Sequence, residues 1–143
     1  MADMNDQKEH TGRCLCGAIR YRAYGAPNWA AFCHCESCRR ATGGVVAAYA
    51  GFPADKFRFE AGEPAAYTSS YGVTRTFCGR CGTSLTYASD RWPTEVHVLL
   101  GAADHPEDFT PQCHAYTKDR LPWLHFADGL PAFATVASES VVE

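Results

Sequence analysis

Three cysteines within six residues are the feature that most constrains how this chain can fold. They are Cys33, Cys35 and Cys38, and Arg39 and Arg40 follow directly. In an extended segment the side chains of Cys33 and Cys35 project to the same face, and a turn can bring Cys38 back onto them. Zinc prefers thiolate ligands, and an ion held by three protein groups keeps a fourth position free, as catalytic zinc does. We interpret the stretch as a catalytic zinc site.

Two other interpretations of this cluster stay open. Cys35 and Cys38 form a C-x-x-C pair, which is also typical of thiol–disulfide chemistry. A cysteine from elsewhere in the chain could instead close the zinc site and make it purely structural. Either case would make the protein a zinc-stabilised binding module or a redox sensor without catalysis.

Length, composition and charge limit the number of domains, the partners and the location of the protein. The chain has 143 residues, 46% of them hydrophobic, which is enough to bury one core. A formal net charge of −3 without a dense Lys/Arg run argues against nucleic acid as a partner. The longest apolar run, residues 45–50, is too short to span a bilayer, so we expect no membrane partner and a cytoplasmic location. Eight cysteines in a reducing compartment favour metal ligation over a disulfide framework.

Glycine, proline and short apolar segments predict a mostly β protein of short antiparallel sheets with little helix. Ile19, Tyr21 and Ala23 alternate with polar residues in the pattern of a half-buried strand. One short helix is expected over residues 36–42, ending at Gly43. Further strands are expected over residues 29–32, 45–50, 56–60, 65–69, 73–77, 84–87, 95–100 and 112–117. We expect residues 1–11 to be a disordered tail, 12–137 a single zinc-binding domain and 138–143 a C-terminal tail.

A second cysteine motif lies near the middle of the chain. Cys78 and Cys81 form a C-x-x-C pair followed by Gly82, the pattern of a zinc knuckle. A knuckle supplies only two ligands, and Cys14 and Cys16 are the other pair left once the three-cysteine cluster is assigned to its own ion. Four thiolates make a closed structural zinc site, which would tie the first strand to the middle of the chain.

These motifs together resemble the glutathione-dependent formaldehyde-activating enzyme (GFA) family, which includes the centromere protein V type domain. The resemblance rests on G-x-C-x-C-G at residues 12–17, C-x-C-x-x-C-R-R ending in glycine at 33–43, and F-C-x-x-C-G-T-x-L at 77–85. It implies an Mss4-like fold with two zinc ions per chain. The first ion would be held by Cys14, Cys16, Cys78 and Cys81, and the second by the three-cysteine cluster.

The resemblance also implies an activity. Family members are described as carbon-sulfur lyases that add glutathione to formaldehyde, giving S-hydroxymethylglutathione. Zinc carrying three thiolates acidifies water less than histidine-bound zinc, so glutathione or another small thiol suits such a site better than hydrolysis does. Arg39 and Arg40 would then either bind a glutathione carboxylate or offset the anionic zinc centre; both roles stay open.

Several other residues have structural interpretations. His34 would project to the opposite strand face from the flanking cysteines, so we expect a packed, hydrogen-bonded side chain. His114 would be either a buried structural residue or an acid–base group. Cys113 is expected to be a small hydrophobic residue, with a role as a fourth ligand left open. We expect Trp29, Trp123 and Tyr116 to pack in the core. Oligomeric state is not predicted by the sequence.

Overall fold

The structure is a computed structural model, and it describes residues 8–137. Seven strands form the larger sheet, in the order β10-β3-β4-β9-β8-β7-β6. Strand β10 pairs with β3 in parallel, and the other neighbours of this sheet pair in antiparallel fashion. The strands are β3 (Trp29–Cys33), β4 (Ala47–Pro53), β6 (Ala65–Ser70), β7 (Val73–Phe77), β8 (Ser84–Ser89), β9 (Glu95–Leu99) and β10 (His114–Ala115).

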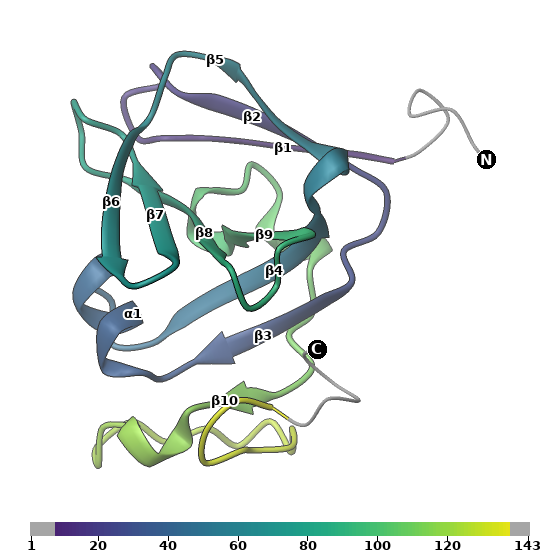
Figure 1. Cartoon of the computed structure of the whole chain (residues 1–143). Coiled ribbons are helices and arrows are strands. Elements are labelled where there is room, and N and C mark those ends of the chain that lie inside the picture. Colours follow the sequence, from purple (N-terminus) through teal and green to yellow (C-terminus); the bar gives the residue numbers. More distant parts are fainter. Residues whose placement is uncertain (1–7, 138–143) are drawn as a thin grey trace.

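A three-stranded antiparallel sheet covers one side of the larger sheet. Its strands are β1 (Glu9–Arg13), β2 (Arg20–Tyr24) and β5 (Phe57–Ala61), which lie at the top of Figure 1. Tyr21 and Ala23 of β2 are buried, as their alternation predicts, and they pack in one cluster with Phe52 and Val98 of the larger sheet. Burial of this shared apolar surface holds the two sheets together.

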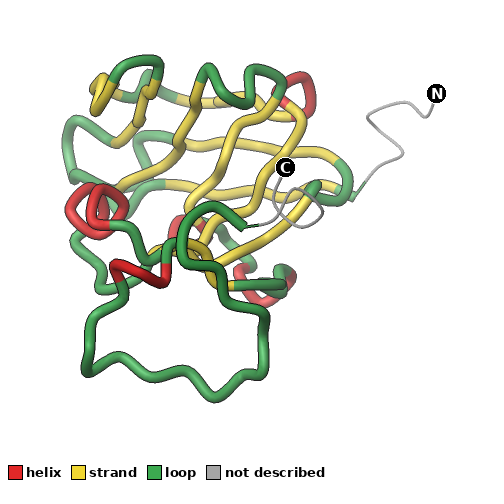
Figure 2. The backbone as a smooth tube through the Cα atoms, turned by 60° about the horizontal axis from the view of Figure 1, so that its bottom comes forward, coloured by secondary structure: helices red, strands yellow, loops and turns green. Residues whose placement is uncertain are grey.

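Helical structure is short and peripheral (Figure 2). Helix α1 (Glu36–Thr42) begins after Cys35, whose sulfur accepts a hydrogen bond from the N–H of Cys38, and it ends at Gly43 with φ 76°. A positive φ is a conformation that glycine adopts without strain, which explains the stop. Four 3-10 segments complete the helical part: η2 (Ala54–Lys56), η3 (Leu100–Ala102), η4 (Pro106–Asp108) and η5 (Thr117–Asp119). No helix within residues 8–137 is long and apolar enough to cross a membrane.

The prediction of a mostly β fold with short, mainly antiparallel sheets and one small helix is confirmed. Several strand boundaries shift by one to three residues, as in β4, which spans Ala47–Pro53 against the expected 45–50. Two further differences have a clear physical cause. The strand expected over residues 112–117 is only His114–Ala115, because Tyr116 has a left-handed backbone (φ 57°) that ends the extended run. Residues 9–11 belong to β1 rather than to a tail, because Glu9 pairs with Tyr24 across the sheet. The rest of the expected tails, residues 1–7 and 138–143, lies outside the described residues.

Candidate metal centres and their cavity

The four cysteines predicted to share a zinc ion come together between the two sheets. Cys14 and Cys16 lie in the turn after β1, and Cys78 and Cys81 lie in the turn between β7 and β8. Their sulfur atoms all lie within 4.8 Å of one another. The Cys14–Cys16 and Cys16–Cys78 sulfur separations are 3.6 and 3.7 Å. A tetrahedral ion with zinc–sulfur bonds of about 2.3 Å requires sulfur separations of about 3.8 Å, so this donor set fits zinc.

Hydrogen bonds to sulfur prepare this cluster for a cation. The backbone N–H of Ile19 donates to Cys14 Sγ at 3.2 Å, and two N–H groups of the knuckle donate to Cys78 Sγ at 3.3 and 3.4 Å. A hydrogen bond from the Thr83 hydroxyl lowers the pKa of Cys81 to about 5. Donors directed at sulfur favour the thiolate, which is the form that binds zinc. Cys14 and Cys16 lie in a turn closed by the hydrogen bond from the Gly17 N–H to the Cys14 carbonyl, and this turn brings both sulfurs to the same point.

The second group of thiols lies where β3 meets α1. Cys33 ends β3, Cys35 precedes the helix and Cys38 lies in its first turn, and the three sulfur atoms lie within 4.8 Å of one another. Among residues 8–137 no fourth His, Cys, Asp or Glu joins this group. Three soft donors without a fourth fit a zinc ion with one open position. Cys113 is fully buried in the same hydrophobic cluster, and it packs as the small apolar residue expected.

Cys38 receives polar contacts from the centre of the large sheet. The Tyr49 hydroxyl donates to Cys38 Sγ at 3.3 Å, and both terminal nitrogens of the Arg75 guanidinium lie 3.9 Å from the same sulfur. Arg75 is only 8% exposed and also donates to the Tyr49 oxygen at 3.3 Å. Hydrogen bonds from Cys33 and Cys35 are the main cause that lowers the pKa of Cys38 to about 2, and Tyr49 and Arg75 act in the same direction. Cys38 is therefore the sulfur of this cluster best prepared to carry negative charge.

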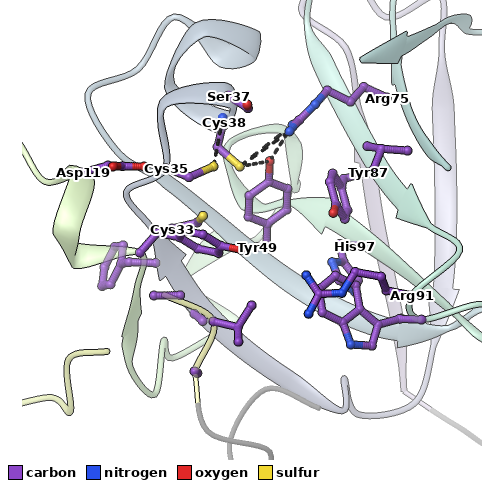
Figure 3. Close-up of a pocket in the computed structure, with 18 of the residues that line it drawn as sticks. Cys33, Cys35, Ser37, Cys38, Tyr49, Arg75, Tyr87, Arg91, His97 and Asp119 are labelled. Carbon is purple, nitrogen blue, oxygen red and sulfur yellow. Dashed lines mark hydrogen bonds between the residues drawn. The ribbon is translucent and has the colours of Figure 1, made fainter. Parts of the chain in front are cut away.

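The three thiols open onto a cavity of about 390 Å³ (Figure 3). Aromatic side chains form much of its wall: Trp29, Tyr49, Tyr87, Trp92 and the imidazole of His97. Charged side chains lie at its two sides, with Asp119 next to the cysteines and Arg75 and Arg91 across from it in the view of Figure 3. A cavity of this volume is large enough for a small peptide.

A buried carboxylate fixes the aromatic wall. Glu95 accepts hydrogen bonds from Asn28 at 2.8 Å, His97 at 3.1 Å and the Trp29 indole at 3.4 Å. Burial would raise the pKa of Glu95, but the hydrogen bonds from His97 and Asn28 outweigh it, so the pKa is lowered. Trp29 also packs against Gly51, where an added Cβ would overlap the indole ring. These contacts hold Trp29 and His97 in defined orientations on the wall.

The sequence comparisons agree with this geometry. A family model described as "Glutathione-dependent formaldehyde-activating enzyme" matches residues 9–119, which include both cysteine clusters. The chain belongs to this family. The motif resemblance predicts an Mss4-like zinc-binding fold. The two sheets and the two cysteine groups described above agree with that fold.

Individual relatives of this GFA-family chain extend the comparison. A Halomonas elongata protein, whose name provisionally assigns it as a glutathione-dependent formaldehyde-activating enzyme, is 31% identical over 147 residues, covering 92% of this chain and 91% of its own. A Schizosaccharomyces pombe protein named as an uncharacterized lyase is 34% identical over 82 residues, covering 56% and 58%. The crystal structure of a Rhodobacter sphaeroides protein superposes with a TM-score of 0.56 at 21% identity, over 86% of this chain and 98% of that one, and this likeness concerns the fold alone.

The two arginines predicted to bind substrate lie away from the cavity. Arg40 pairs with Glu36 at 2.8 Å along the outer face of α1, and neither Arg39 nor Arg40 lines the cavity. The Nε of Arg39 is buried without a hydrogen-bond partner within the described part of the chain. A role of these arginines in binding substrate stays a prediction.

The histidines flanking the cluster form a polar chain. His34 Nε2 lies 2.9 Å from His114 Nδ1, and His114 Nε2 lies 2.8 Å from the carboxylate of Asp128. Both histidines are buried. His34 is hydrogen-bonded as expected, and His114 has the buried position that its structural interpretation requires. The chain ties the segment after β10 to the cysteine-bearing end of β3. Trp29 is buried as expected, although it also lines the cavity. The expected core positions of the other two aromatic residues were wrong, because Trp123 is 64% exposed and Tyr116 is half-buried in the cavity wall.

Sequence reasoning missed five residues that shape the cavity: Tyr49, Arg75, Arg91, His97 and Asp119. None of them belongs to a spaced motif. The only signal that could have identified Arg75 was an arginine at an inward position of a strand, because such a charge needs a buried partner. That partner is the Cys38 thiol together with the Tyr49 hydroxyl.

Proposed function

We propose that the protein is a zinc-dependent enzyme of the carbon-sulfur lyase type that acts on glutathione adducts. Its reaction would be the formation and breakdown of S-hydroxymethylglutathione from glutathione and formaldehyde, or the equivalent reaction of a related small thiol. Cys14, Cys16, Cys78 and Cys81 would hold a structural zinc, and Cys33, Cys35 and Cys38 a catalytic one. Family membership and the relatives' names support this assignment.

One observation carries the proposal: three thiols, without a fourth ligand among residues 8–137, open onto a cavity large enough for a small peptide. A closed structural site needs no cavity, and the four-cysteine cluster has no such opening among the cavities described. Zinc bound by the three thiolates would acidify an incoming thiol and keep its sulfur as the nucleophilic thiolate.

The residues around Cys38 suit the addition step. The thiol sulfur forms a bond to the aldehyde carbon, the carbonyl π bond breaks, and its electron pair moves onto oxygen. The thiol loses one proton and the new hydroxymethyl oxygen takes up one, so the reaction balances. The Arg75 guanidinium is fixed at this end of the cavity and has one more N–H group than its contacts with Cys38, Tyr49 and Ser69 use. The single hydroxyl proton of Tyr49 is directed at Cys38 Sγ, so Tyr49 acts through that sulfur. Donors positioned where negative charge develops on oxygen stabilise the transition state more than the neutral carbonyl.

The aromatic wall contributes by restricting water. Trp29, Tyr87 and Trp92 line the cavity with large apolar surfaces. A partly desolvated site strengthens the hydrogen bonds from Tyr49 and Arg75, and it limits loss of the aldehyde to its hydrate. We further propose a cytoplasmic location, since a reducing compartment keeps metal-binding cysteines in their thiol form.

The test is exchange spectroscopy on ¹³C-formaldehyde and glutathione at equilibrium. The reaction proceeds without a catalyst, so the measured quantity is the added exchange rate per mole of zinc-loaded protein. We expect a rate that rises linearly with protein, is removed by Cys35→Ser and falls with Tyr49→Phe. An exchange rate that folded, zinc-loaded protein does not change would refute the activity.

Calorimetry distinguishes the enzyme from a binding or redox-sensing module. Glutathione should release protons when it binds, because its thiol ionises, and the number released follows from titrations in buffers of different ionisation enthalpy. S-methylglutathione keeps both carboxylates but has no ionisable thiol, so it should release none. Equal binding of the two ligands without proton release would favour the module without catalysis.

A further inference from the structure

Two unpaired charges of opposite sign lie on the cavity wall. They are Arg91, in the turn between β8 and β9, and Asp119, which ends η5. Within residues 8–137 no salt bridge joins either of them to a partner. Figure 3 shows them at opposite sides of the cavity, with Cys33 and Tyr49 between.

The other charged groups of the wall already have partners. Arg75 is directed at Cys38, Tyr49 and Ser69, with its Nε donating to the serine oxygen at 3.1 Å. The carboxylate of Glu36 is bound by Arg40 outside the cavity. Arg91 and Asp119 are therefore the charges of the wall that remain available to a ligand.

Each of the two is held in place without being neutralised. The Arg91 guanidinium carbon lies 4.7 Å above the centre of the Trp92 ring, a cation–π contact that leaves the edges of the guanidinium free to donate. The carboxylate of Asp119 accepts one hydrogen bond, from the backbone N–H of Glu36 at 3.4 Å, which places it beside the start of α1 and next to Cys35. A carboxylate has several acceptor positions, so most of those of Asp119 stay open.

We propose that the cavity binds its thiol substrate in one direction, with an ammonium group at Asp119, the sulfur at the three-cysteine cluster and a carboxylate at Arg91. This inference rests on the proposed function and names the substrate class as a zwitterionic peptide thiol. In glutathione the γ-glutamyl end carries the ammonium together with an α-carboxylate, the other end carries only the glycine carboxylate, and the thiol lies between. That order of charges matches the order Asp119, cysteines, Arg91 across the cavity.

The direction assigns a specificity role to Arg91. A guanidinium can hold a carboxylate through two parallel hydrogen bonds, and a stacked guanidinium loses little freedom when it does so. Simple thiols without a carboxylate, such as 2-mercaptoethanol, would lack this anchor. We therefore expect them to enter the cavity but to bind weakly.

Binding of three ligands to zinc-loaded variants tests the direction. The ligands are glutathione, its glycine monoethyl ester and N-acetylglutathione, which lacks the ammonium charge. Arg91→Gln should weaken glutathione binding about tenfold or more, the usual effect of losing a charge-assisted hydrogen bond. The same variant should bind the ester as wild type does, because the ester has no carboxylate at that end. Asp119→Asn should weaken glutathione similarly but leave N-acetylglutathione unchanged.

Matched controls remove charges outside the cavity. Arg58→Gln and Asp55→Asn change the net charge by the same amounts at exposed positions, and they should bind all three ligands like wild type. Circular dichroism and zinc content verify that each variant is folded and loaded. The direction is overturned if Arg91→Gln weakens glutathione and its ester equally, if it affects only N-acetylglutathione, or if neither cavity variant weakens glutathione. Wild-type protein that binds none of the ligands would instead refute the proposed function, and the direction with it.

Discussion

The hydroxyl of Tyr49 donates a hydrogen bond to Cys38 Sγ across 3.3 Å. Tyr49 belongs to β4, whose neighbours in the sheet are β3 and β9, whereas Cys38 lies in α1. The contact therefore ties the middle of the large sheet to the three-cysteine cluster. Hydrogen bonds to a ligand atom orient it and tune the metal, so this contact has measurable consequences.

Tyr49→Phe should weaken zinc binding at the three-cysteine cluster by about 10–100-fold, the usual cost of losing an outer hydrogen bond to a ligand. The variant removes one donor to Cys38 and one of the two oxygen acceptors of Arg75, the other being the Ser69 hydroxyl. Zinc release to a chelator, followed with a chromogenic dye, should show one phase that becomes faster and a slow phase from the four-cysteine cluster that does not change.

The control for this variant is Tyr67→Phe, because Tyr67 is 64% exposed on β6. This variant also removes a tyrosine hydroxyl, but one that has no contact with a cysteine sulfur. Both phases of zinc release should therefore be as in wild type. If Tyr49→Phe releases zinc exactly like the Tyr67 variant, the hydrogen bond does not support the metal centre.

The two cysteine clusters should differ in their effect on folding. Cys81→Ser should lower the melting temperature strongly or abolish folding, because that cluster joins the turn after β1 to the turn between β7 and β8. Cys35→Ser should change melting comparatively little, since its neighbours Cys33 and Cys38 are already held by β3 and α1. Thermal circular dichroism of the reduced proteins measures both, and an equal loss from the two variants would make the second cluster structural.

Zinc content should follow the same division. Protein purified under reducing conditions should carry up to two zinc ions per chain, one at each cysteine cluster. The ion at Cys33, Cys35 and Cys38 should leave first on dialysis against a chelator, because three thiolates hold it rather than four. Native mass spectrometry gives the stoichiometry at each step, and reduced protein without any zinc would contradict both sites.

The sequence was sufficient to predict the cysteine clusters because their ligands come from short, spaced motifs. The partition into four and three thiols follows from pairs two or three residues apart, and the structure brings the same pairs together. Strand positions were also predictable where polar and apolar residues alternate, as around Tyr21. Local pattern determines these features, so no knowledge of the tertiary fold is needed.

The cavity could not be predicted in the same way. Tyr49, Arg75, Arg91 and Asp119 come from β4, β7, the β8–β9 turn and η5, and only the pairing of the sheet brings them together. Arg39 and Arg40 were predicted to contact the substrate, but they do not line the cavity. They adjoin Cys38 in sequence, yet side chains one or two positions apart on a helix project in different directions, and Arg40 pairs with Glu36 outside the cavity.

The aromatic wall leads to a prediction about pH. The pKa of Glu95 is lowered because hydrogen bonds from His97 and Asn28 outweigh its burial, which acts in the opposite direction. A carboxylate with a lowered folded pKa stabilises the protein above its ordinary pKa of 4.5, and this stabilisation is lost as pH falls through the folded value. Glu95→Gln should therefore cost about 1–3 kcal/mol of unfolding free energy near neutral pH. The difference from wild type should shrink as the pH falls below 4.5.

Urea unfolding of the wild type and Glu95→Gln at matched pH values measures this difference directly. Loss of zinc thiolates in acid affects both proteins, so it cancels in the comparison, whereas the contribution of the Glu95 charge does not. Glu63→Gln is the matched control, because Glu63 is exposed and forms no salt bridge within residues 8–137. A destabilisation by Glu95→Gln that stays constant from neutral to acid pH would show that Glu95 holds Trp29 and His97 through shape alone, without its negative charge.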